Sequence, residues 1–246
     1  MKNTKVISNT VMTSIENLKI LYEDNHIIVV LKGADILSQS DNTGDLDMLN
    51  AVKHYLKIKY EKPGRVYLGL VHRLDRRVGG LMVFAKTSKA AGRLAAVIRE
   101  RQFEKQYIAL VAGDTPRSGE LVDYLVKTQL KGRPIAQAVT SNVEHAKKAV
   151  LKYHKINSFY LDDNTFTFLL VDLVTGRYNQ IRKQLALSGY PIVNDFKYGY
   201  RGKNYDNRLG LFCYRLTFPH PTKKETIDIK YYPSDWLWLK MEGVDT

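Results

Sequence analysis

Short apolar segments of strand length recur along the chain, and they constrain its fold more than any other feature. Runs rich in Ile, Val, Leu, Tyr and Phe that are bounded by turn residues are typical of β-strands. They predict two strands within 18–33 around the turn EDNH, and further strands at 81–87, 103–113, 150–156, 165–176, 211–221 and 225–233. Because these segments do not alternate regularly with helices, the pattern predicts an α+β fold with largely antiparallel pairing.

Three segments have apolar residues at helical spacing. Helices are predicted over 46–60, over 88–102 with Ser88 as a candidate N-cap, and over 178–191. A fourth segment, 126–149, is basic and polar, which predicts a loop or hairpin that contacts a partner.

The charge of the chain indicates what kind of partner to expect. Lys and Arg total 38 against 25 Asp and Glu, a formal net charge of +13. A surplus of this size is typical of proteins that bind a polyanion, because each neutralised phosphate releases condensed counterions. Sixteen tyrosines offer rings on which bases can stack. Charge alone leaves open a soluble protein that is simply basic.

Several classes of protein are disfavoured. No run of about 18 apolar residues is present, so no membrane span is expected. The single cysteine, Cys213, excludes an internal disulfide and fits a reducing, cytoplasmic compartment. The six histidines are not paired at metal-ligand spacing, so no metal is expected. The glycines form no phosphate-binding loop or dinucleotide fingerprint, which disfavours functions driven by nucleotides.

The stretch VHRLDRRVGG, residues 71–80, places one acid, Asp75, among Arg73, Arg76 and Arg77. One interpretation is a structural ion pair. The other is a carboxylate that neighbouring cations keep ionised, ready to act as a nucleophile or to stabilise a positive sugar-like centre. The residues alone leave both interpretations open.

The stretch HRLDRRVGGLMVFAKT resembles the signature of the RluA family of pseudouridine synthases. Further segments resemble other motifs of that family in the same order, from about residue 18 to 232: LYEDNHIIVVLKGAD, FEKQYIALVAG, VTGRYNQIRKQLALSGYPIVNDFKYG and LFCYRLTFPHP. The resemblance implies the pseudouridine synthase fold, a mixed and mostly antiparallel sheet that bends around a basic catalytic cleft with flanking helices. It also implies an enzyme that converts uridine in RNA into its C-glycoside without a cofactor or metal.

The resemblance assigns roles to five residues. Asp75 corresponds to the essential aspartate, which either attacks the sugar or assists abstraction of its 2′ proton. Tyr107 corresponds to the tyrosine that stacks on the target base and removes the final proton from C5. Arg182 corresponds to the basic residue that pairs with the aspartate. Arg73 is expected to fill the space of the flipped-out nucleotide, and Arg177 to brace the cleft or hold phosphate.

Several positions differ from the family pattern, and all are positions that support the cleft. The differences are Val78 and Gly79 for Thr-Ser, Asn179 for His, Gln184 for a second His, Gly33-Ala34-Asp35 after Lys32 for Pro-Ala-Gly, and Phe212 for His. The three catalytic residue types are retained, so an active enzyme is expected with altered selection of RNA.

The expected partner is structured RNA, either tRNA or rRNA, and the expected protein is a cytoplasmic monomer. Residues 1–17 are predicted to form a flexible arm, and 18–246 the catalytic domain, without the N-terminal RNA-binding module common in the family. The alternative function is a catalytically silent RNA-binding protein or RNA chaperone that kept the fold. A two-carboxylate glycosidase is a weak third hypothesis, because no second acid accompanies Asp75 in the motifs.

Overall fold

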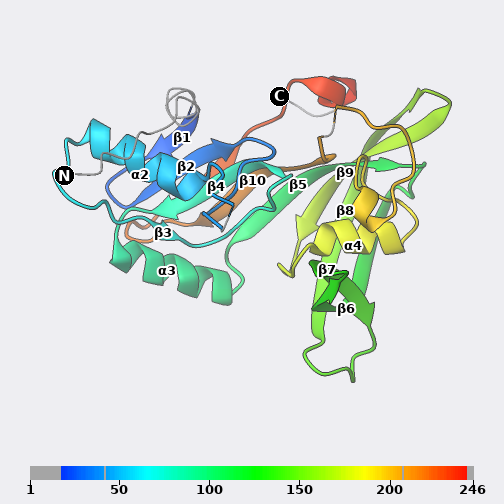
Figure 1. Ribbon diagram of the computed structural model, residues 1–246, viewed down its shortest axis with the longest axis horizontal. Coiled ribbons are helices and arrows are strands. Elements are labelled where there is room, and N and C mark those ends of the chain that lie inside the picture. The colour runs from blue at the N-terminus through cyan, green and yellow to red at the C-terminus, as the bar shows by residue number, and fades with distance from the viewer. Residues whose placement is uncertain (1–17, 42, 207, 243–246) are drawn as a thin grey trace. The chain divides into compact units, whose positions relative to one another are not determined.

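The computed structural model describes residues 18–242 except 42 and 207, and the predicted arm 1–17 lies outside this part (Figure 1). The chain divides into two compact units. The first comprises residues 1–102 and 219–226, and the second comprises 103–218 and 227–246. Within the described residues, no helix combines the length and the apolar character needed to cross a membrane.

The first unit is built on a small antiparallel sheet. Strands β1 (Ile20–Glu23) and β3 (Gly69–Leu70) flank the pair formed by β2 (Ile27–Lys32) and β4 (Gly79–Ala85), and the pairs β1–β2, β2–β4 and β3–β4 are antiparallel. The side chains of 27–30 and 81–85 are fully buried. Strands with continuous apolar runs are covered on both faces, which explains why this sheet lacks the alternation of an exposed one.

Two helices accompany this sheet, α2 (Met48–Lys59) and α3 (Ser88–Arg99). Asp47 caps α2 by accepting a hydrogen bond from the backbone N–H of Asn50 at 2.9 Å. The cap of α3 is Thr87, whose hydroxyl accepts from the N–H of Ala90 at 3.1 Å. The prediction that Ser88 caps this helix was therefore wrong by one residue. The backbone of Thr87 is extended, as an N-cap requires, whereas Ser88 is already helical.

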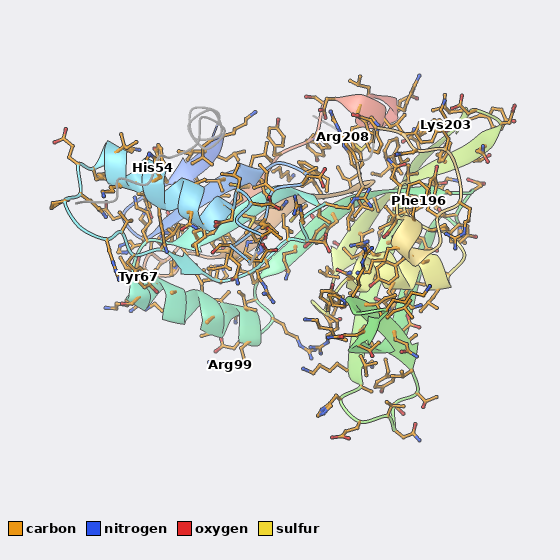
Figure 2. The ribbon with its side chains drawn as sticks, in the orientation of Figure 1. His54, Tyr67, Arg99, Phe196, Lys203 and Arg208 are labelled. Atoms are coloured by element: carbon orange, nitrogen blue, oxygen red, sulfur yellow. The ribbon has the colours of Figure 1, made fainter. Side chains whose placement is uncertain are left out.

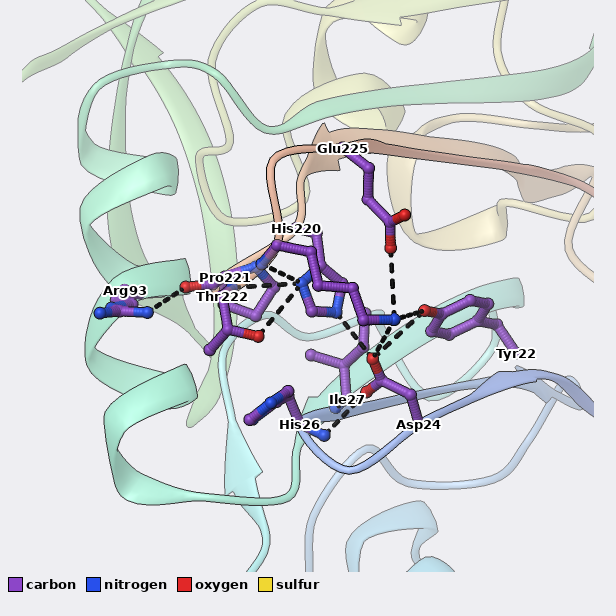
Figure 3. Close-up of polar contacts among 10 residues, drawn as sticks. Tyr22, Asp24, His26, Ile27, Arg93, His220, Pro221, Thr222 and Glu225 are labelled. Carbon is purple, nitrogen blue, oxygen red and sulfur yellow. Dashed lines mark hydrogen bonds and ion pairs between the residues drawn. The ribbon is translucent and has the colours of Figure 1, made fainter.

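The segment 219–226 is attached to the turn between β1 and β2 by a buried histidine (Figure 3). Nδ1 of His220 accepts hydrogen bonds from the backbone N–H groups of Thr222 and Lys223, at 3.1 and 2.9 Å. Its Nε2 lies 2.9 Å from Oδ2 of Asp24. Because Nδ1 is the acceptor, Nε2 carries the proton and donates to Asp24.

The second unit contains a larger antiparallel sheet. Its strands are ordered β10-β5-β9-β8-β6-β7, and β11 pairs with β10. Their bounds are β5 (Glu104–Ala112), β6 (Ser118–Leu130), β7 (Arg133–Val139), β8 (Lys147–Leu161), β9 (Asn164–Leu173), β10 (Leu211–Pro219) and β11 (Thr226–Lys230). The residues 108–111 in β5 are fully buried, so the centre of this strand lies in the core.

Helix α4 (Gln180–Leu187) packs on the β6–β8 part of this sheet through a buried glutamine. The side-chain amide of Gln184 donates to the carbonyl of Leu121 at 3.1 Å and to Oδ2 of Asp123 at 2.7 Å. Two short 3₁₀ helices, η1 (Phe196–Tyr198) and η2 (Trp236–Lys240), complete the unit.

The α+β class, the antiparallel pairing and the three helices are confirmed. The structure differs from the sequence prediction at 126–149, which contains the end of β6, all of β7 and the beginning of β8. The hairpin alternative is therefore the right one for this segment. The first half of β6 was not predicted, because its burial is mixed and it has no continuous apolar run.

Candidate active site

Asp75 lies in the loop between β3 and β4, where its own turn holds the carboxylate. Oδ1 accepts a hydrogen bond from the backbone N–H of Arg77 at 3.1 Å, and the Asp75 carbonyl accepts from the N–H of Val78 at 3.0 Å. The residue is half-buried. Arg76 forms an ion pair with Asp45 at 2.6 Å, so at least one neighbouring arginine has another carboxylate as its partner.

A buried lysine holds the same loop from within the first unit. Lys32 ends β2, is fully buried, and donates to the carbonyls of Gly33, Ile36 and Arg76 at 2.8, 2.7 and 2.9 Å. Burial lowers the pKa of Lys32 to about 7, although the negative charge of Asp75 opposes this change. The three carbonyls match the three N–H donors of an ammonium group.

Two further contacts hold the residues just before Asp75, one with the segment between β2 and α2 and one with β4. The hydroxyl of Ser38 donates to the carbonyl of Leu74 at 2.7 Å and accepts from its N–H at 3.1 Å. Nε2 of His72 accepts from the N–H of Val83 in β4 at 3.1 Å. The segment around Asp75 is therefore fixed on both sides, whereas Arg73 between these contacts has an exposed side chain.

Tyr107 lies in the buried centre of β5 in the second unit. It is opposite Cys213 in β10 and opposite Val171 in β9. Burial raises the pKa of Tyr107 well above its usual range, and the adjacent Cys213 raises it further. The register between β5 and β10 shifts directly after Cys213, and such bulges are common beside functional sites, where they redirect side chains.

Arg182 is buried in the second unit, on the inner face of α4. Its Nε and one terminal nitrogen each donate to the carboxylate of Asp195, both at 2.7 Å. Its guanidinium also lies over the ring of Tyr198, 5.0 Å from the ring centre. A bidentate pair with a ring contact holds the guanidinium in one orientation.

The remaining predicted residues of the second unit lie before α4, at its start and in β10. Nε of Arg177 donates to the carbonyl of Lys148 at 3.0 Å. Asn179 adopts a left-handed backbone with φ of 48°, which Asn tolerates better than most residues, and its side chain donates to Tyr198 at 3.1 Å. Phe212 is buried and packs against Tyr231.

Asp75 and Arg73 belong to the first unit, whereas Tyr107, Arg177 and Arg182 belong to the second. The expectation that Asp75, Tyr107 and Arg182 act together in one basic cleft remains a prediction.

Sequence reasoning missed two residues that organise these positions, Lys32 as a donor to the Asp75 loop and Asp195 as the partner of Arg182. A lysine that ends an apolar strand was the available signal for the first. For the second, the acid lies thirteen residues from Arg182 in sequence, which no local pattern reveals.

The chain matches the family model described as RNA pseudouridylate synthase over residues 26–187. It is 30% identical over 243 residues to the ribosomal large subunit pseudouridine synthase C of Buchnera aphidicola subsp. Baizongia pistaciae, covering 96% of this chain and 73% of that protein. It is 35% identical over 211 residues to the protein of the same name from Buchnera aphidicola subsp. Schizaphis graminum, covering 82% of this chain and 63% of that protein.

Solved structures show the same fold. Human RNA pseudouridylate synthase domain containing 1 superposes with a TM-score of 0.72 at 23% identity, covering 92% of this chain and 87% of that one. A second human protein, RNA pseudouridylate synthase domain containing 4, superposes with a TM-score of 0.71 at 20% identity, covering 91% of both chains. Together with the match to the family model, these likenesses confirm the pseudouridine synthase fold. The chain belongs to the RNA pseudouridylate synthases and is a member of their RluA-type family.

Proposed function

We propose that this protein isomerises specific uridines of structured RNA to pseudouridine with Asp75 as the reacting carboxylate, and that its RNA is ribosomal. The observation that carries the proposal is the half-buried carboxylate of Asp75, which a turn and the buried Lys32 hold in place. The choice of rRNA over tRNA rests on relatives named for the large ribosomal subunit.

The reaction is an isomerisation, so the product contains the same atoms as the substrate. The bond between N1 and C1′ breaks, the base rotates, C5 bonds to C1′, and the proton that leaves C5 is balanced by one taken up at N1. Asp75 assists the first step by attacking the sugar or by accepting its 2′ proton. The turn at Arg77 and the contacts of the buried Lys32 hold this carboxylate in place for either route.

The assignment of Tyr107 divides into two parts with different support. A buried ring in the rigid centre of β5 is suited to stacking on a base. Because its pKa is raised, the hydroxyl is protonated at neutral pH, so it must first pass its own proton to another base before the phenolate can accept the C5 proton. To Arg182, whose orientation Asp195 holds, we assign the separate role of the basic residue that pairs with the catalytic aspartate.

The test compares Asp75→Asn with Asp45→Asn. Asp45 is an exposed acid that pairs with Arg76 near the same loop, so its replacement removes a negative charge without removing the reacting group. Pseudouridine in rRNA is measured by mass spectrometry, and RNA affinity by titration. Asp75→Asn should abolish product while RNA affinity stays within a few-fold, and Asp45→Asn should retain activity. Turnover by Asp75→Asn would contradict the proposal and favour a silent RNA-binding protein.

Arg73 is proposed to occupy the space of the flipped nucleotide, because its side chain is exposed two residues before Asp75. Arg73→Ala should slow single-turnover isomerisation on a structured stem-loop more than on an unstructured RNA with the same site. Lys131→Ala, in the β6–β7 turn, should weaken both RNAs alike. An equal loss of rate on the two RNAs with Arg73→Ala would remove the base-flipping role.

A further inference from the structure

The second unit carries a basic pocket beside the start of α4, and its two lysines have no part in the proposed reaction. It has a volume of about 520 Å³. Its lining comes from the end of β6, the start of β8 and the segment before α4: Leu125, Val126, Lys127, His145, Lys147, Gly176, Arg177 and Tyr178. Three of these eight side chains are Lys or Arg, and none of these lining residues is acidic, although His145 lies 3.3 Å from the carboxylate of the adjacent Glu144.

The register of the sheet places the two lysines on one face. Leu125 in β6 is directly opposite Lys147 in β8, and Lys127 is two residues further along β6. Because side chains alternate between the faces of a strand, Lys127, Leu125 and Lys147 point to the same side. Within the described residues, neither Lys127 nor Lys147 forms an ion pair with a carboxylate, and both are exposed.

An aromatic ring gathers further positive charge at this pocket. The ring centre of Tyr178 lies 5.0 Å from Nζ of Lys127 and 5.7 Å from Nζ of Lys197. The Pro134 carbonyl accepts from the Tyr178 hydroxyl at 3.3 Å and from Nζ of Lys197 at 2.6 Å. Ammonium groups on an aromatic ring are attracted to its face, so the ring orders lysines that would otherwise repel each other.

Arg177 adds a planar donor group. Its Nε is taken by the carbonyl of Lys148, and within the described residues its two terminal nitrogens have no hydrogen bond. A guanidinium held by Nε with its terminal nitrogens available is suited to two parallel hydrogen bonds with a phosphate. The pocket thus combines two exposed lysines with a bidentate donor.

We propose that this pocket binds the phosphodiester backbone of the substrate RNA. The inference rests on the proposed function in taking RNA as the ligand. Adjacent phosphates are repeating anions that satisfy several cations at once, and their binding releases counterions. Contacts of this kind with phosphates position the RNA without reading its bases.

The test compares two double variants that each remove two positive charges from the second unit. Lys127→Ala/Lys147→Ala removes the pocket lysines. The control, Lys155→Ala/Lys203→Ala, removes lysines that already pair with Asp114 and Asp162; Lys203 is labelled in Figure 2. Lys155 is also in β8, about 26 Å from Lys147 along the strand.

Affinity for one stem-loop RNA is measured at several salt concentrations. The pocket variant should bind roughly tenfold more weakly at low salt, and the slope of log affinity against log salt should fall by about 2, near 0.9 for each lost contact. The control should stay within about twofold of the wild type. Equal affinities and slopes for the two variants would overturn the proposal.

Two further measurements keep this result separate from the proposed reaction. At saturating enzyme, the pocket variant should isomerise RNA at a rate within about twofold of the wild type, and a large loss there would place the lysines in the reaction instead. A wild type that binds RNA but forms no pseudouridine would contradict the proposed function while the affinity comparison still decides the pocket. Thermal melting checks that each variant is folded. The test is then repeated with charge reversal, which compares Lys127→Glu/Lys147→Glu with Lys155→Glu/Lys203→Glu.

Discussion

Replacing Lys32 by methionine should destabilise the protein by an amount that depends on pH. The change leaves three buried carbonyls, those of Gly33, Ile36 and Arg76, without their donor. Loss of hydrogen bonds to a charged group costs about 1.5–3 kcal/mol each. Removing the buried ammonium offsets part of this loss, because the fall of its pKa from 10.5 to about 7 corresponds to about 5 kcal/mol against the charged form.

The sign of the pH dependence follows from the lowered pKa. Below about pH 7 the lysine is charged in both the folded and the unfolded chain, and the full penalty for burying the charge is present. As pH rises from about 7 toward 10.5, the folded protein loses the proton first, so the wild type gains stability. Between about pH 6 and pH 9 this gain is about 2.5 kcal/mol, and Lys32→Met lacks it.

The assay is urea denaturation of the wild type and Lys32→Met at about pH 6 and pH 9. The destabilisation caused by the substitution should be about 2.5 kcal/mol larger at the higher pH. Lys131→Met, which replaces an exposed lysine in the β6–β7 turn, controls for the general loss of positive charge. A destabilisation by Lys32→Met that is the same at both pH values would refute the reasoning about the buried ammonium.

Three other substitutions test the remaining contacts. Tyr107→Phe should keep RNA affinity but stop before product release, seen in rapid-quench analysis as an intermediate in which C5 is bonded to C1′ and keeps its proton, whereas full activity would assign the base to another group. Arg182→Met should destabilise by about 3–5 kcal/mol in urea, because it leaves Asp195 buried without its partner, and a loss below about 1 kcal/mol would contradict this. Burial raises the pKa of Glu23, but hydrogen bonds from the side chains of Lys59, Lys86, Tyr60 and Tyr55 outweigh it and lower the pKa to about 2. The wild type should therefore lose stability as pH falls from 4.5 toward 2. Glu23→Gln should lack this acid-dependent loss, and equal acid melting curves would show that the cluster does not stabilise the fold.

The strands and helices were largely predictable because they depend on local patterns. The apolar run of β4 specifies a buried strand whatever lies beyond it in sequence. The apolar spacing of α2 and α3 likewise marks one face of a helix. β6 could not be predicted in full, because its side chains vary in burial along its length and it has no single period.

The sequence by itself also identified the family, through the motifs around Asp75, Tyr107 and Arg182, and so named these residues as the candidates for the site. The tertiary structure decided how these groups are held. Lys32 reads as an ordinary charged end of a strand, yet carbonyls from two loops converge on its ammonium. Arg182 alone would be expected on an exposed helix face, yet Asp195 makes its burial tolerable. Partners of this kind are set by packing between distant segments, because a buried charge is stable only where the folded chain supplies its hydrogen bonds.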